Sequence, residues 1–220
     1  MPTTTAPDGL LRASVYEELR RRFVTGKIMP GSSLSTRGVA LELGVSQMPV
    51  REALSRLAAE GAVEIRSKRR IVVPAMTAER FKDLLRCREL LEPEAAASAL
   101  PFIDAARLKR LRAVDDALGV ALKTGNVTSY MEGNFEFHFT IYRAQPRRTM
   151  TQLIETLWLQ FGPYMRVVYG RVGTASLVDQ HQVAIRAVRD RSTTRLKRAI
   201  LADIRDGMGL IGKSGFESGT

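Results

Sequence analysis

Apolar residues recur every four positions near the start of the chain and predict an amphipathic helix. The stripe runs from Leu11 through Val15 and Leu19 to Phe23, and most positions between are charged or polar. Gly26 follows, where a residue in the left-handed conformation commonly ends a helix. The pattern therefore predicts one helix that closes before residue 26.

Two shorter helical segments follow it, separated by a tight turn. Ser35 is placed to cap a helix over residues 36–43, and Gly44 ends that helix. Ser46 is placed to cap a further helix, with Pro49 in its first turn, where the missing N–H costs little. Two short helices joined by a glycine-bearing turn are typical of a helix-turn-helix, whose second helix enters the major groove of DNA.

The next segment changes from a helical to a strand pattern. Residues 63–66 alternate between apolar and polar, and residues 71–73 are all β-branched. The basic run between them, residues 67–70, would be typical of a solvated turn if it stood alone. Beside a helix-turn-helix, it favours a wing, a hairpin whose cationic tip reaches DNA phosphate or the minor groove.

The second half of the chain reads as helical throughout. Pro74 breaks the strand and Thr77 is placed to cap a new helix, so a domain boundary is expected between them. The expected helices cover residues 81–91, 108–118, 130–143, 150–168, 177–188 and 196–208. We therefore predict a mainly α protein: a tail (1–9), a winged helix-turn-helix of three helices plus a β-hairpin (10–75), an all-α antiparallel bundle (77–212) and a second tail (213–220).

Composition narrows the class of partner. The 220 residues carry a net charge of +11. The segment before Met76 contains 12 basic and 7 acidic residues. Such an excess favours a polyanion such as nucleic acid, although a generally basic surface would give the same balance. No apolar run is long enough to span a membrane. Cys87 is the single cysteine, which excludes an internal disulfide and indicates a reducing cytoplasm.

The first half resembles the GntR family of bacterial repressors. Residues 26–35 (GKIMPGSSLS) and 43–54 (LGVSQMPVREAL) carry the resemblance. It implies a homodimer on a roughly palindromic double-stranded DNA operator, with Arg37 and Arg51 contacting DNA. Gln47 stands where the family usually has arginine, which favours adenine or loses a contact, and Arg70 replaces a usual glycine of the wing. The expected DNA-binding residues are Arg37, Ser46, Gln47, Met48, Pro49, Arg51, Lys68, Arg69 and Arg70.

The second half resembles the FCD effector domain of the FadR-like subfamily. Residues 86–96 (RCRELLEPEAA) and 134–138 (NFEFH) carry this looser resemblance, together with the surroundings of residues 181 and 203. It implies a divalent metal held by an acid and three histidines. Here the matching positions are Asn134, His138, His181 and Asp203, a set that could hold Zn²⁺, Ni²⁺ or Mn²⁺ more weakly than the family pattern.

Two alternatives remain open for this site. The histidines could instead form hydrogen bonds in a polar cavity that binds an organic effector directly, with Arg88, Asn134, His138 and His181 as effector-binding residues. Arg88 matches a position that often faces the cavity, where it would pair with a carboxylate ligand, but it could equally form a salt bridge to Glu92, four residues on.

The expected function is a ligand-responsive transcriptional regulator, a repressor released by a small carboxylate metabolite. A metal-dependent hydrolase using His138, His181 and Asp203 is the rival from another class, but no general base or oxyanion donor is evident and the DNA-binding half would be unexplained. An activator or an architectural DNA binder would share the same head. We therefore expect no enzymatic activity.

Overall fold

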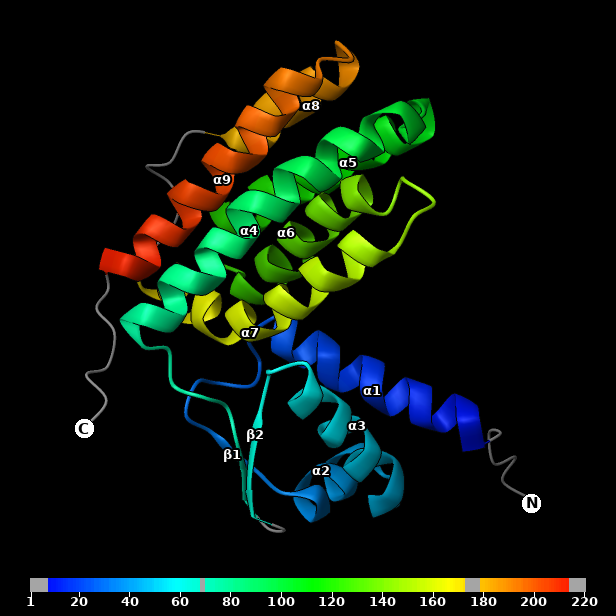
Figure 1. Cartoon of the computed structure of the whole chain (residues 1–220), viewed down its shortest axis with the longest axis vertical. Coiled ribbons are helices and arrows are strands. Elements are labelled where there is room, and N and C mark those ends of the chain that lie inside the picture. Colours follow the sequence, from blue (N-terminus) through cyan, green and yellow to red (C-terminus); the bar gives the residue numbers. More distant parts are fainter. Residues whose placement is uncertain (1–7, 68–69, 173–178, 214–220) are drawn as a thin grey trace.

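The chain folds into a small winged head and a helical bundle, which lie at opposite ends of the computed structural model (Figure 1). The structure describes residues 8–67, 70–172 and 179–213. The head contains α1 (Asp8–Val24), β1 (Ser33–Leu34), α2 (Thr36–Leu43), α3 (Gln47–Ala59), β2 (Glu64–Ser67) and β3 (Arg70–Val72). The bundle contains α4 (Ala78–Ala99), a 3₁₀ turn (Leu100–Phe102), α5 (Ala105–Lys123), α6 (Val127–Tyr142), α7 (Thr149–Val172), α8 (Gln180–Arg189) and α9 (Thr193–Lys213).

Local capping sets the helix-turn-helix. The Ser35 side chain accepts a hydrogen bond from the Gly38 N–H (3.0 Å), and α2 ends at Gly44 in the left-handed conformation, with φ of 66°. Ser46 precedes α3 in an extended conformation but makes no side-chain cap within the described residues. The inward faces of α1 and α3 then pack together, and Leu19 is completely buried between them. The predicted bounds of α2 are therefore confirmed, and the cap of α3 is weaker than expected.

The wing is part of a three-stranded antiparallel sheet with the order β1-β3-β2. The predicted hairpin is present as β2 and β3, with Ile65 opposite Ile71. The description of the head as three helices plus a hairpin missed β1, which pairs Ser33 with Val72 and Leu34 with Ile71. Because β1 has only two residues, no alternation of apolar and polar positions could reveal it.

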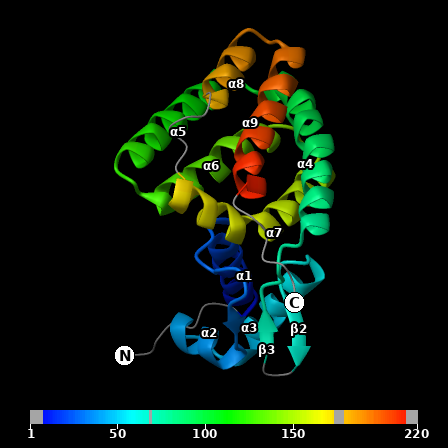
Figure 2. The same ribbon diagram turned by 90° about the vertical axis from the view of Figure 1, so that its left-hand side faces the viewer.

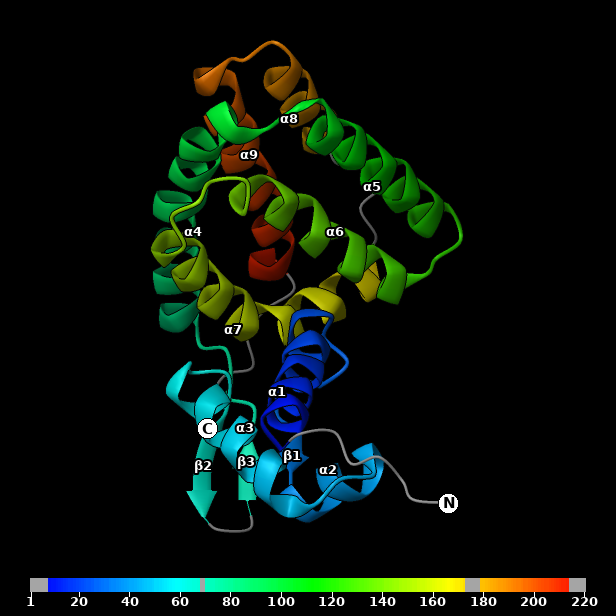
Figure 3. The ribbon, with the colours of Figure 1, turned by 90° about the vertical axis from the view of Figure 1, so that its right-hand side faces the viewer.

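The bundle surrounds a buried interior. Helix α4 packs along α9, α5 along α6, and α8 along α9, while α7 lies at the end nearest the head (Figures 2 and 3). The Thr77 side chain caps α4 by accepting from the Arg80 N–H (3.2 Å), as predicted. Helix α1 begins at Asp8, inside the expected tail, and α9 ends at Lys213. None of the described helices is long and apolar enough to cross a membrane.

The head is seated directly on α7. A Cβ atom added to Gly162 would overlap the carbonyl oxygen of Phe23, and one added to Gly26 would lie 2.9 Å from the carbonyl oxygen of Gly162. The Arg80 guanidinium also donates to the carbonyl oxygen of Gly61 (2.9 Å), which joins the start of α4 to the end of the helix-turn-helix. At Gly162 the head and the bundle therefore meet backbone against backbone, and side chains such as Arg80 add hydrogen bonds beside this contact.

Candidate functional site

The exposed face of α3 carries the predicted DNA-reading residues. Gln47, Met48 and Arg51 are exposed on this helix, and Arg37 is exposed on α2. Within the described part of the chain, neither Arg37 nor Arg51 forms a hydrogen bond or an ion pair, so both guanidinium groups are available to a partner. Arginine in this position can grip a phosphate or fork onto guanine.

The remaining predicted DNA-binding residues differ from these in their exposure or lie outside the described part of the chain. Pro49 is buried in the first turn of α3, so its side chain packs within the head, and its place among the DNA-binding residues remains a prediction. Ser46 is exposed beside Gln47, and Arg70 is exposed at the start of β3. Lys68 and Arg69 lie outside the described residues.

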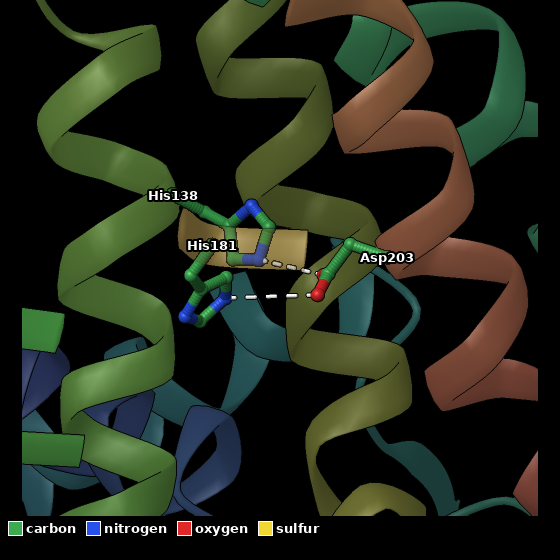
Figure 4. Close-up of side chains that lie close together, drawn as sticks. All are labelled: His138, His181 and Asp203. Atoms are coloured by element: carbon green, nitrogen blue, oxygen red, sulfur yellow. Dashed lines mark ion pairs between the residues drawn. The ribbon is translucent and has the colours of Figure 1, made fainter. Parts of the chain in front are cut away.

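Inside the bundle, three side chains from three helices converge (Figure 4). His138 of α6, His181 of α8 and Asp203 of α9 each offer a ligand atom, and these atoms all lie within 4.8 Å of one another. Nε2 of His138 lies 3.1 Å from Oδ2 of Asp203, and Nε2 of His181 lies 3.7 Å from Oδ1. The fold thus brings together three of the four residues that the resemblance to the FCD domain assigned to a metal site.

Neither Nε2 atom at this point makes a hydrogen bond within the described structure, although both are buried. Nε2 of His138 nevertheless lies close enough to Asp203 to lower the pKa of that carboxyl. A buried nitrogen without a partner costs about 1–3 kcal/mol. Two such atoms beside one carboxylate form an arrangement that a bound cation would stabilise.

The opposite ring nitrogens do have partners. Nδ1 of His181 lies 3.3 Å from Oδ1 of Asp115 on α5, and Nδ1 of His138 lies 3.1 Å from the Tyr142 hydroxyl. Asp115 was not predicted from the sequence, although a signal exists: it falls between Leu111 and Leu118 on the inward face of α5, where an acidic residue is unexpected.

The electrostatics of the site follow from these contacts. Burial lowers the pKa of His181, but the hydrogen bond to Asp115 and the negative charge of Asp203 outweigh it, so the pKa of His181 lies above its ordinary value. Burial raises the pKa of Asp203, but the close His138 ring, the His181 charge and Arg88 together lower it to about 2. Phe137 stacks on the His181 ring with centroids 3.9 Å apart and fixes its plane.

Arg88 pairs with Glu92, which is the alternative considered for it. Both side chains are buried, and two guanidinium nitrogens of Arg88, Nε and Nη2, donate to the two carboxylate oxygens. The remaining terminal nitrogen lies 3.6 Å from the sulfur of Met208. Arg88 therefore reaches the interior of the bundle, but its charge is already neutralised there by a protein carboxylate.

Asn134, the fourth predicted ligand, is buried on α6 one helical turn before His138. That spacing places both on one face of the helix. Its role as a ligand remains a prediction.

The three converging residues fit a divalent metal. Tetrahedral zinc sites use nitrogen and oxygen ligands at about 2.0–2.1 Å, which places ligand atoms about 3.4 Å from one another. The separations of 3.1 Å to Oδ2 and 3.7 Å to Oδ1 lie on either side of that value, and the ligand atoms of the whole set lie within 4.8 Å of one another. A metal here would be held by His138, His181 and Asp203, and it would supply a Lewis acid with open positions for an oxygen ligand.

A winged head, seated on a helical bundle with an internal polar site and presenting two arginines that are unpaired in the described part of the chain, defines a two-domain transcription regulator. Residues 11–73 match the gntR family of bacterial regulatory proteins, and residues 83–206 match the FCD domain. The chain belongs to the GntR family and its second domain is an FCD domain.

The relatives agree with this assignment. The chain is 29% identical over 167 residues to the HTH-type transcriptional regulator McbR of Escherichia coli (strain K12), covering 76% of each protein. It is 25% identical over 202 residues to the gluconate operon transcriptional repressor of Bacillus subtilis (strain 168), covering 87% of this chain and 81% of the repressor. The solved structure of E. coli McbR/YncC has the same fold, with a TM-score of 0.87 at 24% identity over 93% of this chain and 98% of that one. The predicted family, fold and regulatory function are thereby confirmed, and the hydrolase interpretation has no support among these relatives.

Proposed function

We propose that this regulator is a homodimeric repressor that holds a divalent metal at His138, His181 and Asp203, and that a small carboxylate releases it from its operator. The observation that carries the proposal is the pair of buried Nε2 atoms, unpartnered in the described structure, that face one carboxylate. When both rings are neutral and carry their proton on Nδ1, such a cluster is costly by itself, because three acceptors meet without a donor. A divalent cation that joins the three atoms stabilises it.

The head supplies the DNA contact. Arg51 and Arg37 are exposed and unpaired in the described structure, and Gln47 and Met48 lie on the same exposed helix face. In a dimer, two such heads would read half-sites about one helical turn apart, which is why the operator would be roughly palindromic.

The bundle supplies the response. A metal held by His138, His181 and Asp203 would supply a Lewis acid that could take an oxygen ligand from a small carboxylate. Release from DNA requires that the carboxylate bind one arrangement of the heads better than the other. Helix α7 gives a short route for this, because Trp158 donates to Glu92 beside the site (3.2 Å) and Gly162 contacts the head.

A DNA-binding titration tests the proposal. Fluorescence anisotropy on DNA upstream of the protein's own gene, at about 200 mM salt, would suppress non-specific phosphate binding. We expect saturable, sequence-specific binding by a dimer, weakened by a carboxylate from a panel of small organic acids only when Zn²⁺, Ni²⁺ or Mn²⁺ is present. Binding that is lost at this salt, or that no acid alters in the metal-loaded protein, would contradict the repressor and effector parts respectively. Transcription that rises with protein in a reconstituted assay would favour an activator.

A further inference from the structure

The Glu92 carboxylate is saturated with donors. Oε1 accepts from Arg88 Nε and from the Trp158 indole N–H (3.2 Å), and Oε2 accepts from Arg88 Nη2 (3.3 Å) and from the Tyr142 hydroxyl (2.9 Å). A carboxylate has about four lone-pair directions, so all of its accepting capacity is used by these groups. Glu92 therefore acts as an acceptor toward each of these neighbours.

This saturation fixes the direction of the next hydrogen bond. The Tyr142 hydroxyl has a single proton, which it donates to Glu92, and burial together with Glu92 raises the pKa of Tyr142 well above its ordinary value. Its oxygen can then only accept from Nδ1 of His138, 3.1 Å away. A neutral His138 ring must accordingly carry its proton on Nδ1, which leaves a lone pair on Nε2.

The second histidine is fixed in the same way by a different helix. Oδ2 of Asp115 accepts from the Gln182 side-chain amide, and Oδ1 faces Nδ1 of His181 at 3.3 Å. The Asp115 carboxylate accepts in both contacts, so His181 donates from Nδ1. Its Nε2 atom also presents a lone pair toward Asp203 when the ring is neutral.

We propose that Asp115 and Tyr142 are positioning residues, which hold both imidazoles in the Nδ1–H tautomer so that two nitrogen lone pairs and one carboxylate converge on a cation. The inference rests on the proposed metal site but adds residues outside it. Ligating histidines commonly donate their other N–H to a carboxylate or similar group, and loss of that group weakens metal binding by about 10- to 100-fold. Here we call each such chain of hydrogen bonds a relay. Asp115 contacts His181 directly, whereas Glu92 acts on His138 through the Tyr142 hydroxyl.

Nuclear magnetic resonance of the full-length protein tests this directly, because the chain contains only two histidines. With ¹⁵N-labelled histidine, the metal-free protein at a pH where both rings are neutral should show two imidazoles, each protonated on Nδ1. In water the neutral side chain prefers the Nε2–H form, so this result distinguishes the relays from an unconstrained ring. Either ring protonated on Nε2 would overturn the proposal for that histidine.

Variants then connect the tautomer to metal affinity. Asp115→Ala and Tyr142→Phe should each weaken Zn²⁺ binding, measured by chelator competition, by about 10- to 100-fold. Each should also change the tautomer signals of its own histidine while leaving the other ring unaltered. Asp116→Ala on the exposed face of α5 and Tyr130→Phe, the other tyrosine of α6, are the matched controls and should change neither.

The failures are distinguishable. If the wild-type protein shows both Nδ1–H tautomers but does not bind Zn²⁺, Ni²⁺ or Mn²⁺, the proposed metal is wrong and the relays stand. If metal binds but the two variants bind it as tightly as wild type, the positioning roles are wrong. The wild-type spectrum requires no substitution, so a variant that fails to fold leaves the proposal falsifiable.

Discussion

Gly162 and Phe23 meet without room for a side chain between them. A Cβ atom at position 162 would overlap the Phe23 carbonyl oxygen and would lie 2.8 Å from Cα of Val24. Because the obstacle is backbone at the end of α1, it cannot move aside as a flexible side chain would. This contact fixes the position of the DNA-binding head against α7.

We expect Gly162→Ala to force the head away from α7 and to destabilise the protein by about 1–3 kcal/mol, the usual cost of overpacking. Thermal unfolding followed by circular dichroism measures the change. Gly119→Ala is the matched control, since Gly119 is helical with nothing within 4 Å of an added Cβ, and it should be neutral or slightly stabilising. Equal melting temperatures for the two variants would contradict the tight seat.

Arg51 and Arg56 provide a comparison on one helix. Arg51 is exposed without a partner in the described structure, whereas Arg56 pairs with Glu60 at 3.2 Å and lies over the Tyr16 ring at 3.7 Å. We expect Arg51→Ala to weaken operator binding by about 1–3 kcal/mol, the value of a good base contact. Arg56→Ala should leave DNA affinity nearly unchanged. Similar losses in both variants, measured by anisotropy, would mean that DNA binding depends on overall charge and not on the face of α3.

Gln47 should determine one base of the operator. A glutamine side chain can form two hydrogen bonds with adenine, whereas arginine at the same place would match guanine. We expect Gln47→Arg to change the preferred base at one symmetric pair of operator positions from adenine to guanine, while total affinity for the best site stays high. Selection from a randomised DNA library measures the preference. An unchanged consensus would show that Gln47 does not read a base.

The sequence was informative where local chemistry decides the structure. Ser35 and Gly44 gave the bounds of α2, and the alternation around the wing gave the hairpin, because caps and strand patterns act over a few residues. The two-residue strand β1 and the seat of Gly162 were not predicted, since both depend on segments distant in the chain. Asp115 was missed because two adjacent acids resemble a solvated helix face until the packing of α5 is known.

The two roles predicted for Arg88, an ion pair with Glu92 and effector binding, differ in their effect on stability. Its pairing with Glu92 is now visible, and breaking a buried ion pair by removing one partner typically costs about 3–5 kcal/mol. We expect Arg88→Met to lower the free energy of unfolding by about this amount, measured in urea. Lys197→Met removes an exposed ion pair with Glu94 and should cost less than about 1 kcal/mol. A small effect at Arg88 with complete loss of effector response would instead favour the effector-binding role.

Asn134 offers a test of the fourth ligand. It is buried one turn before His138, and its amide oxygen is a weaker metal ligand than a carboxylate because it carries no charge. If Asn134 faces the metal, Asn134→Asp should raise Zn²⁺ affinity and increase the melting temperature of the metal-loaded protein over that of the wild type. A metal concentration about a hundredfold above the dissociation constant stabilises a fold by about 2.7 kcal/mol, so tighter binding is measurable as heat stability. His138→Ala in the same assay should abolish the metal-dependent shift altogether. If the Asn134→Asp substitution gives no tighter Zn²⁺ binding and lowers stability without metal, Asn134 belongs to the core and lies outside the coordination sphere.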